Sequence, residues 1–142
     1  MVKSTATIFF RHCRLNHNAV EQSAFFYLFK IISFFPFPDS YATVTFSVGN
    51  KIIKTKKGAV HQGSRDPLFN ESFNFTVSGD DLGTGTLLVS IMHSRGGGKE
   101  DKLIGRVLLG GMMYARGTEC EHWTEMMTNP RNLIKYWHTL TS

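Results

Sequence analysis

The sequence has few of the residues that carry most enzyme and metal chemistry. Only two cysteines are present, Cys13 and Cys120, and their wide separation matches no disulfide framework and no metal-binding spacing. No Ser-His-Asp or Cys-His arrangement and no complete phosphate-binding loop is recognisable. We therefore predict that the protein is not an enzyme, and the unpaired cysteines fit a reducing, cytoplasmic setting.

A long apolar segment is also missing. The most apolar stretch, residues 24–37, is shorter than the about 20 residues that a transmembrane helix needs, and Lys30 interrupts it. Three interpretations remain open: a membrane-anchoring segment, a buried strand or helix, or residues that are not native to the domain that follows. We therefore divide the chain into an atypical Phe-rich N-terminal segment, residues 1–37, and a domain over residues 38–142.

Acidic residues are outnumbered by basic ones. Sixteen Lys and Arg against eleven Asp and Glu give a formal net charge of +5 and an isoelectric point near 9.4. Such an excess favours anionic partners, which include phospholipid headgroups, nucleic acids and acidic protein surfaces. We expect no nucleic-acid partner, because no recognition helix or aromatic stacking motif accompanies the charge.

After residue 39 the apolar residues follow the period of a β-strand. Ala42, Val44, Phe46 and Val48 alternate with polar neighbours, and a Gly-Asn turn follows at residues 49–50. Further strands are expected over residues 51–57, 69–77, 87–92, 103–109 and 136–140, with a short helix over residues 121–127. The pattern predicts an all-β, antiparallel β-sandwich with a short helix before the last strand.

Two of these strands carry charges that constrain their positions. Lysines project from both faces of residues 51–57, which favours an edge position in a sheet. Glu71 shares a face with Phe69 and Phe73, so its carboxylate is expected to have a partner or to lie near the strand end.

Several motifs occur in the order found in one known family. They are Asp39-Ser40-Tyr41, Lys54-Thr55-Lys56-Lys57-Gly58, Asp66-Pro67-Leu68-Phe69-Asn70-Glu71-Ser72-Phe73, Leu103-Ile104-Gly105, His122-Trp123 and Trp137-His138-Thr139-Leu140. Together they resemble the second, B-type C2 domain of synaptotagmins over residues 39–140. The resemblance implies an eight-stranded C2-type antiparallel β-sandwich whose loops at one end bind calcium and lipid.

The resemblance does not extend to the two strands that open the family fold. Residues 5–10 and 24–35 offer substitute strands, but their sequence matches no family pattern. We therefore expect an incomplete sandwich, with about six family strands recognisable and an unpaired edge.

The calcium ligands that the resemblance implies are mostly missing. Calcium takes six to eight oxygen ligands, and the first loop retains only Asp39. The pair of aspartates in the third loop aligns with His93 and Arg95, and Asp101 lies nearby in a loop one residue longer than the family's. We predict that no metal is bound and that the domain has no cofactor.

The resemblance also assigns basic residues to partner binding. Lys51, Lys54, Lys56 and Lys57 match the strand through which B-type C2 domains contact acidic lipids and proteins. An ordinary edge strand protected by lysines is the alternative. Arg131 matches the first of two arginines that bridge a second membrane, and Asn132 replaces the second.

The C-terminal motif has two interpretations. In the family, the strand that contains Trp137, His138 and Leu140 is implicated in docking, whereas a strand that completes a sheet needs no such role.

We predict a calcium-independent module of vesicle trafficking and exocytosis. It would bind acidic phospholipid membranes and acidic SNARE or other trafficking proteins, peripherally, on the cytoplasmic face of a vesicle or the plasma membrane. Self-association is left open. The alternatives are a calcium-dependent, phospholipid-binding sensor of regulated exocytosis and a truncated C2 fragment without independent function. A longer protein with a membrane anchor upstream is also left open.

Overall fold

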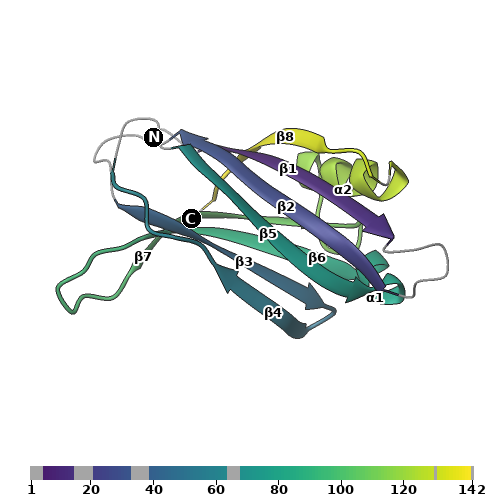
Figure 1. Ribbon diagram of the computed structural model, residues 1–142, viewed down its shortest axis with the longest axis horizontal. Coiled ribbons are helices and arrows are strands. Elements are labelled where there is room, and N and C mark those ends of the chain that lie inside the picture. The colour runs from purple at the N-terminus through teal and green to yellow at the C-terminus, as the bar shows by residue number, and fades with distance from the viewer. Residues whose placement is uncertain (1–4, 15–20, 33–38, 64–67, 130, 142) are drawn as a thin grey trace.

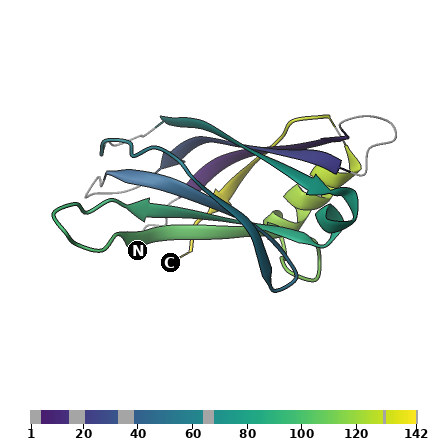
Figure 2. The ribbon, with the colours of Figure 1, turned by 60° about the horizontal axis from the view of Figure 1, so that its bottom comes forward.

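The chain forms two antiparallel β-sheets that face each other, as Figures 1 and 2 show. This computed structural model describes residues 5–14, 21–32, 39–63, 68–129 and 131–141. In order, the elements are β1 (Thr5–Arg14), β2 (Glu21–Ile32), β3 (Ser40–Val48), β4 (Lys51–Lys57), β5 (Leu68–Ser78), α1 (Gly79–Gly83), β6 (Gly85–His93), β7 (Lys102–Gly110), α2 (Thr118–Thr128) and β8 (Ile134–Thr139). The strand orders are β5-β2-β1-β8 and β4-β3-β6-β7.

The all-β sandwich and its late helix are confirmed, and β3 to β8 are the six strands predicted after residue 39. The expectation of an incomplete sandwich needs correction. The Phe-rich segment supplies β1 and β2, and each described sheet has four strands. β2 pairs with β5 and β1 pairs with β8, both antiparallel, so backbone hydrogen bonds cover the edges that were expected to be open. The predicted boundary between residues 37 and 38 lies outside the described residues.

Alternating apolar residues fill the space between the sheets. Ala42, Val44 and Phe46 of β3 are buried, while the residues between them are partly exposed. The same core contains Leu87, Val89 and Ile91 of β6, Phe69, Phe73 and Phe75 of β5, and Trp123 and Met126 of α2. Each Val, Leu, Ile, Phe or Met side chain buried in this way contributes about 1.5–3 kcal/mol to folding. The period-two pattern of the sequence therefore determines which face of each strand points inward.

The two flanks of the sandwich are closed differently. On one flank, β4 and β5 are edge strands, and Lys56 Nζ donates a hydrogen bond across the gap to the carbonyl of Asn74. On the other flank, Arg106 of β7 forms a backbone bridge with Thr141, just beyond β8. α2 covers this second flank and contacts β7, β8 and β1. The basic strand and the late helix therefore lie on opposite flanks.

The described residues contain two helices, of 5 and 11 residues. Within that part of the chain, neither helix has the length and apolar character needed to cross a bilayer.

Candidate functional site

The basic strand β4 is an edge strand, as its lysine pattern predicted. Cross-strand partners project from the same face of a sheet. Lys54 pairs with Phe46 and Lys56 with Val44, so both lysines lie on the face that carries the core. Lys57 pairs with Thr43 on the opposite face. Lys51, Lys54 and Lys57 are exposed, and Lys56 is half-buried.

A small hollow lies between β4 and β5. Its volume is about 180 Å³, and its lining includes Lys54, Lys56, Ile53 and Phe75. Lys56 spans this hollow, with Nζ bonded to the Asn74 carbonyl and 5.2 Å from the centre of the Phe75 ring. Two lysines therefore line the hollow together with apolar side chains.

Two isoleucines extend this surface. Ile52 is 65% exposed and Ile53 is 46% exposed, and the β3–β4 register shifts between Lys54 and Ile52, which marks a bulge at Ile53. Exposed apolar groups among lysines combine charge attraction with hydrophobic contact at a lipid headgroup region.

Lys57 belongs to a second group, at the end of the sandwich where β6 and β7 are joined. Its Nζ lies 4.3 Å from the centre of the Tyr41 ring. The Tyr41 hydroxyl donates to Asp101 Oδ2 at 2.5 Å, and the Arg95 N–H donates to Asp101 Oδ1 at 3.3 Å. These two hydrogen bonds, the Tyr41 bond foremost, lower the pKa of Asp101, and the same bond raises the pKa of Tyr41. Asp101 is thereby held as a carboxylate that fastens the 94–101 loop to β3.

Asp39, just before β3, also accepts hydrogen bonds from the backbone of other segments. Its Oδ1 accepts the Gly63 N–H at 2.7 Å, and its carbonyl accepts the Ser94 N–H at 2.9 Å. His93 ends β6, and Arg95 is exposed in the adjacent loop. Across the described ranges, no three His, Cys, Asp or Glu side chains are grouped in a way that could hold a metal ion. The carboxylates of the two ligand-like aspartates thus each accept a hydrogen bond from a backbone amide, that of Gly63 for Asp39 and that of Arg95 for Asp101.

Glu71 has the partner that its position in β5 required. Its Oε1 lies 2.5 Å from His61 Nε2, and its Oε2 accepts the Ala59 N–H at 3.0 Å. The His61 ring also stacks on Phe69 at a centroid distance of 4.4 Å. Gly58 allows this arrangement, because a Cβ at that position would overlap the Glu71 carboxylate.

A buried pair of histidines was not anticipated, although both belong to motifs that were recognised. His122 of α2 and His138 of β8 are fully buried, with His122 Nδ1 2.8 Å from His138 Nε2. His122 Nε2 lies 2.9 Å from the Ile134 carbonyl, so it must donate, and His122 Nδ1 then accepts from His138. His138 Nδ1 is left buried, with no hydrogen-bond partner among the described residues. Burial lowers the pKa of both histidines to about 4.

The remaining predicted site residues are separated in space. Trp137 is 48% exposed on β8, whereas His138 and Leu140 are buried. A partner that docks on the folded surface would therefore reach Trp137 and not the other two. Arg131 is exposed after α2, and its φ is 73°.

The motifs and the topology agree with comparisons to known proteins. Residues 28–126 match the family model of the C2 domain. The chain belongs to the C2 domain family. The match begins within β2 and ends within the late helix α2, so it covers β3 to β7 in full.

Synaptotagmins are among the relatives of this C2 domain. Synaptotagmin-1 of Aplysia californica is 38% identical over 103 residues, which cover 72% of this chain and 23% of the relative. Synaptotagmin-2 of Homo sapiens is 33% identical over 102 residues, which cover 72% of this chain and 24% of the relative. The chain thus spans about a quarter of the length of these relatives.

Solved C2 domains share the fold at low sequence identity. A C2 domain of the RIM protein from Drosophila has a TM-score of 0.67 and 12% identity, over 99% of this chain and 100% of that chain. The first C2 domain of human synaptotagmin XIII has a TM-score of 0.62 and 13% identity, over 99% of this chain and 88% of that chain. These likenesses establish the C2 fold.

Proposed function

We propose that this C2 domain is a divergent, synaptotagmin-type module of the second, B-type class. It binds acidic phospholipid membranes, and acidic SNARE or other trafficking surfaces, without calcium. The observation that carries the proposal is the edge strand β4, where exposed lysines and isoleucines lie beside a hollow lined by Lys54, Lys56 and Ile53.

The expected strength of membrane binding follows from the charges on β4. A basic side chain close to an anionic membrane contributes roughly 1 kcal/mol. Lys51 and Lys54 are exposed, whereas Lys56 and Lys57 also contact aromatic rings. Attachment through this strand is therefore modest and reversible, and added salt weakens it because the charges are solvent-exposed.

The calcium-independent part of the proposal rests on the contacts of two aspartates. Calcium needs six to eight oxygen ligands, but Asp39 and Asp101 bind backbone amides and a tyrosine hydroxyl. His93 and Arg95 add an imidazole and a cation where the family's ligand pair would stand. Among the residues that the structure describes, these side chains do not fit a calcium site.

The proposed location is peripheral, on the cytoplasmic face of a vesicle or the plasma membrane. In this arrangement β4 contacts the membrane, while Arg131 and Trp137 stay available for weaker contacts with a second membrane or a partner.

Liposome co-sedimentation tests the proposal. Binding is expected to require anionic lipid, to fall as salt rises, and to stay the same when a calcium chelator is added. Loss of binding in the chelator would instead support the calcium-dependent sensor. Failure of the purified chain to unfold cooperatively would support the truncated-fragment alternative.

A matched pair of double variants locates the binding surface. K51A/K54A removes two exposed lysines, and a loss of about 2 kcal/mol, or roughly 30-fold in affinity, is expected. R106A/K135A removes the same charge from the opposite flank, where both residues are exposed, and should leave binding nearly unchanged. Equal losses in the two variants would show that net charge, and not β4, attracts the domain.

A further inference from the structure

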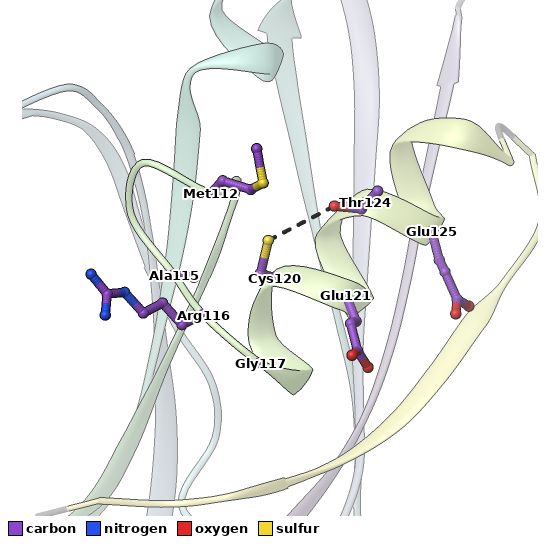
Figure 3. A pocket seen from close by; sticks show the side chains of 8 residues that line it. All are labelled: Met112, Ala115, Arg116, Gly117, Cys120, Glu121, Thr124 and Glu125. Carbon is purple, nitrogen blue, oxygen red and sulfur yellow. Dashed lines mark hydrogen bonds between the residues drawn. The ribbon is translucent and has the colours of Figure 1, made fainter.

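A groove runs between α2 and the segment that precedes it, residues 111–117 (Figure 3). Its volume is about 540 Å³, which makes it several times larger than the hollow beside β4. Met112, Ala115 and Gly117 line it from the loop, and Cys120 and Thr124 line it from the helix. The lining is largely apolar, as in grooves that take an amphipathic helix.

Met112 lines this groove, and Met113 follows it in the same loop. Met112 is 87% exposed and Met113 is 86% exposed. Two adjacent methionine side chains that are exposed to water form an apolar surface that a partner could cover. The flexible thioether side chain also adapts to differently shaped apolar surfaces, and it is used in this way where helical targets are bound.

The side chains of α2 fall into three distinct rows. Trp123 and Met126 point inward and are buried in the core. Cys120 and Thr124 are one turn apart on the groove side, with Cys120 Sγ 3.9 Å from Thr124 Oγ1 (Figure 3). Glu121 and Glu125 form the next row, also one turn apart. The uncharged row of Cys120 and Thr124 therefore lies directly beside an acidic row.

The charge of helix α2 is opposite in sign to that of the whole chain. α2 contains Glu119, Glu121 and Glu125 and no Lys or Arg, although the chain carries a net charge of +5. Glu125 accepts a hydrogen bond from the Tyr136 hydroxyl, and this bond raises the pKa of Tyr136 to about 12. Arg116 lines the groove from the loop, and Figure 3 shows its side chain pointing away from the two glutamates. An anionic membrane would be repelled by the acidic row, whereas a cationic peptide would be attracted.

We propose that this groove binds an amphipathic helix of a partner protein, with a stripe of apolar residues and basic residues four positions apart. The apolar stripe would lie against Met112 and the Cys120–Thr124 row. The basic residues would face Glu121 and Glu125, whose spacing of one helical turn is about 6 Å. α2 lies on the flank opposite β4, so the partner helix and an acidic membrane can be bound at the same time. The inference does not depend on the membrane proposal.

A pair of designed peptides tests the groove with the full 142-residue chain. The probe is a fluorescein-labelled helical peptide with a leucine stripe flanked by lysines, and its counterpart carries glutamates in place of the lysines. Fluorescence anisotropy is expected to show saturable binding of the lysine peptide and at least tenfold weaker binding of the glutamate peptide. Equal binding of both peptides would overturn the proposed charge recognition.

Charge-matched variants then locate the site. E121K reverses one exposed carboxylate in the acidic row and is expected to weaken the lysine peptide about tenfold, because an attraction becomes a repulsion. E100K makes the same change in the exposed 94–101 loop and should leave binding within about twofold. M112S, also fully on the surface, should weaken binding severalfold without lowering the thermal midpoint. Binding that is unchanged in both E121K and M112S, or that falls equally in E100K, would place the peptide elsewhere and refute the proposal.

Discussion

Acid should destabilise this domain through its two buried histidines. In the folded state the pKa values of His122 and His138 are lowered to about 4, because burial disfavours the charged imidazolium. In the unfolded chain both histidines titrate near their ordinary value of 6.5. Between these pH values the unfolded state binds more protons than the folded state, so the free energy of unfolding falls as pH falls.

The magnitude follows from the size of the two pKa shifts. Between pH 7 and pH 5, a shift from 6.5 to about 4 removes roughly 2 kcal/mol for each histidine, or roughly 4 kcal/mol for both. A domain of this size has a total stability of only about 5–15 kcal/mol. The pair is therefore expected to dominate the response of the domain to mild acid.

Urea unfolding followed by tryptophan fluorescence at pH 7, 6 and 5 measures this effect. The matched variant is H122Q/H138L, in which the glutamine amide can still donate to the Ile134 carbonyl and the unpartnered His138 Nδ1 is removed. Its stability is expected to fall by about 4 kcal/mol less than that of the natural chain over this pH range. An equal fall in both proteins would show that the buried pair is not the group that titrates.

Two further predictions concern packing. M126A removes a fully buried side chain from α2 and should cost about 2–5 kcal/mol in urea unfolding, whereas M112A, on an 87% exposed side chain, should change stability by less than about 0.5 kcal/mol. G58A should cost about 1–3 kcal/mol, since the new Cβ displaces the Glu71 carboxylate, while G83A, with nothing within 4 Å of its Cβ, is the control. A G83A loss as large as that of G58A would argue against the close approach.

The sequence predicted most of the strands because a strand that is buried on one face alternates apolar and polar residues. Alternation in β3 and the lysines of β4 located a core strand and an edge strand without any knowledge of their neighbours. The short α1 was not foreseen, because its five residues are too few to show a helical period. β1 and β2 were only candidates, since an almost continuous apolar run does not distinguish a strand from a buried helix.

For the candidate sites, too, the sequence identified residues but not the contacts between them. The sequence identified Asp39, Asp101 and the β4 lysines, because charge and family motif are properties of the chain itself. It could not show that the Tyr41 hydroxyl reaches Asp101, or that the Lys56 ammonium reaches the Asn74 carbonyl. Those contacts join residues 60 and 18 positions apart, so they exist only once strand register is set.

By itself, the sequence determined the fold class, the core face of each patterned strand and the excess of positive charge, because these depend on residue type and local period. Only the tertiary structure decided that β1 and β2 complete one sheet and that His122 meets His138. It also decided that the basic strand and the acidic helix lie on opposite flanks. Each of these follows from the pairing of segments distant in the chain, and no local pattern records which distant segment a strand or helix will contact.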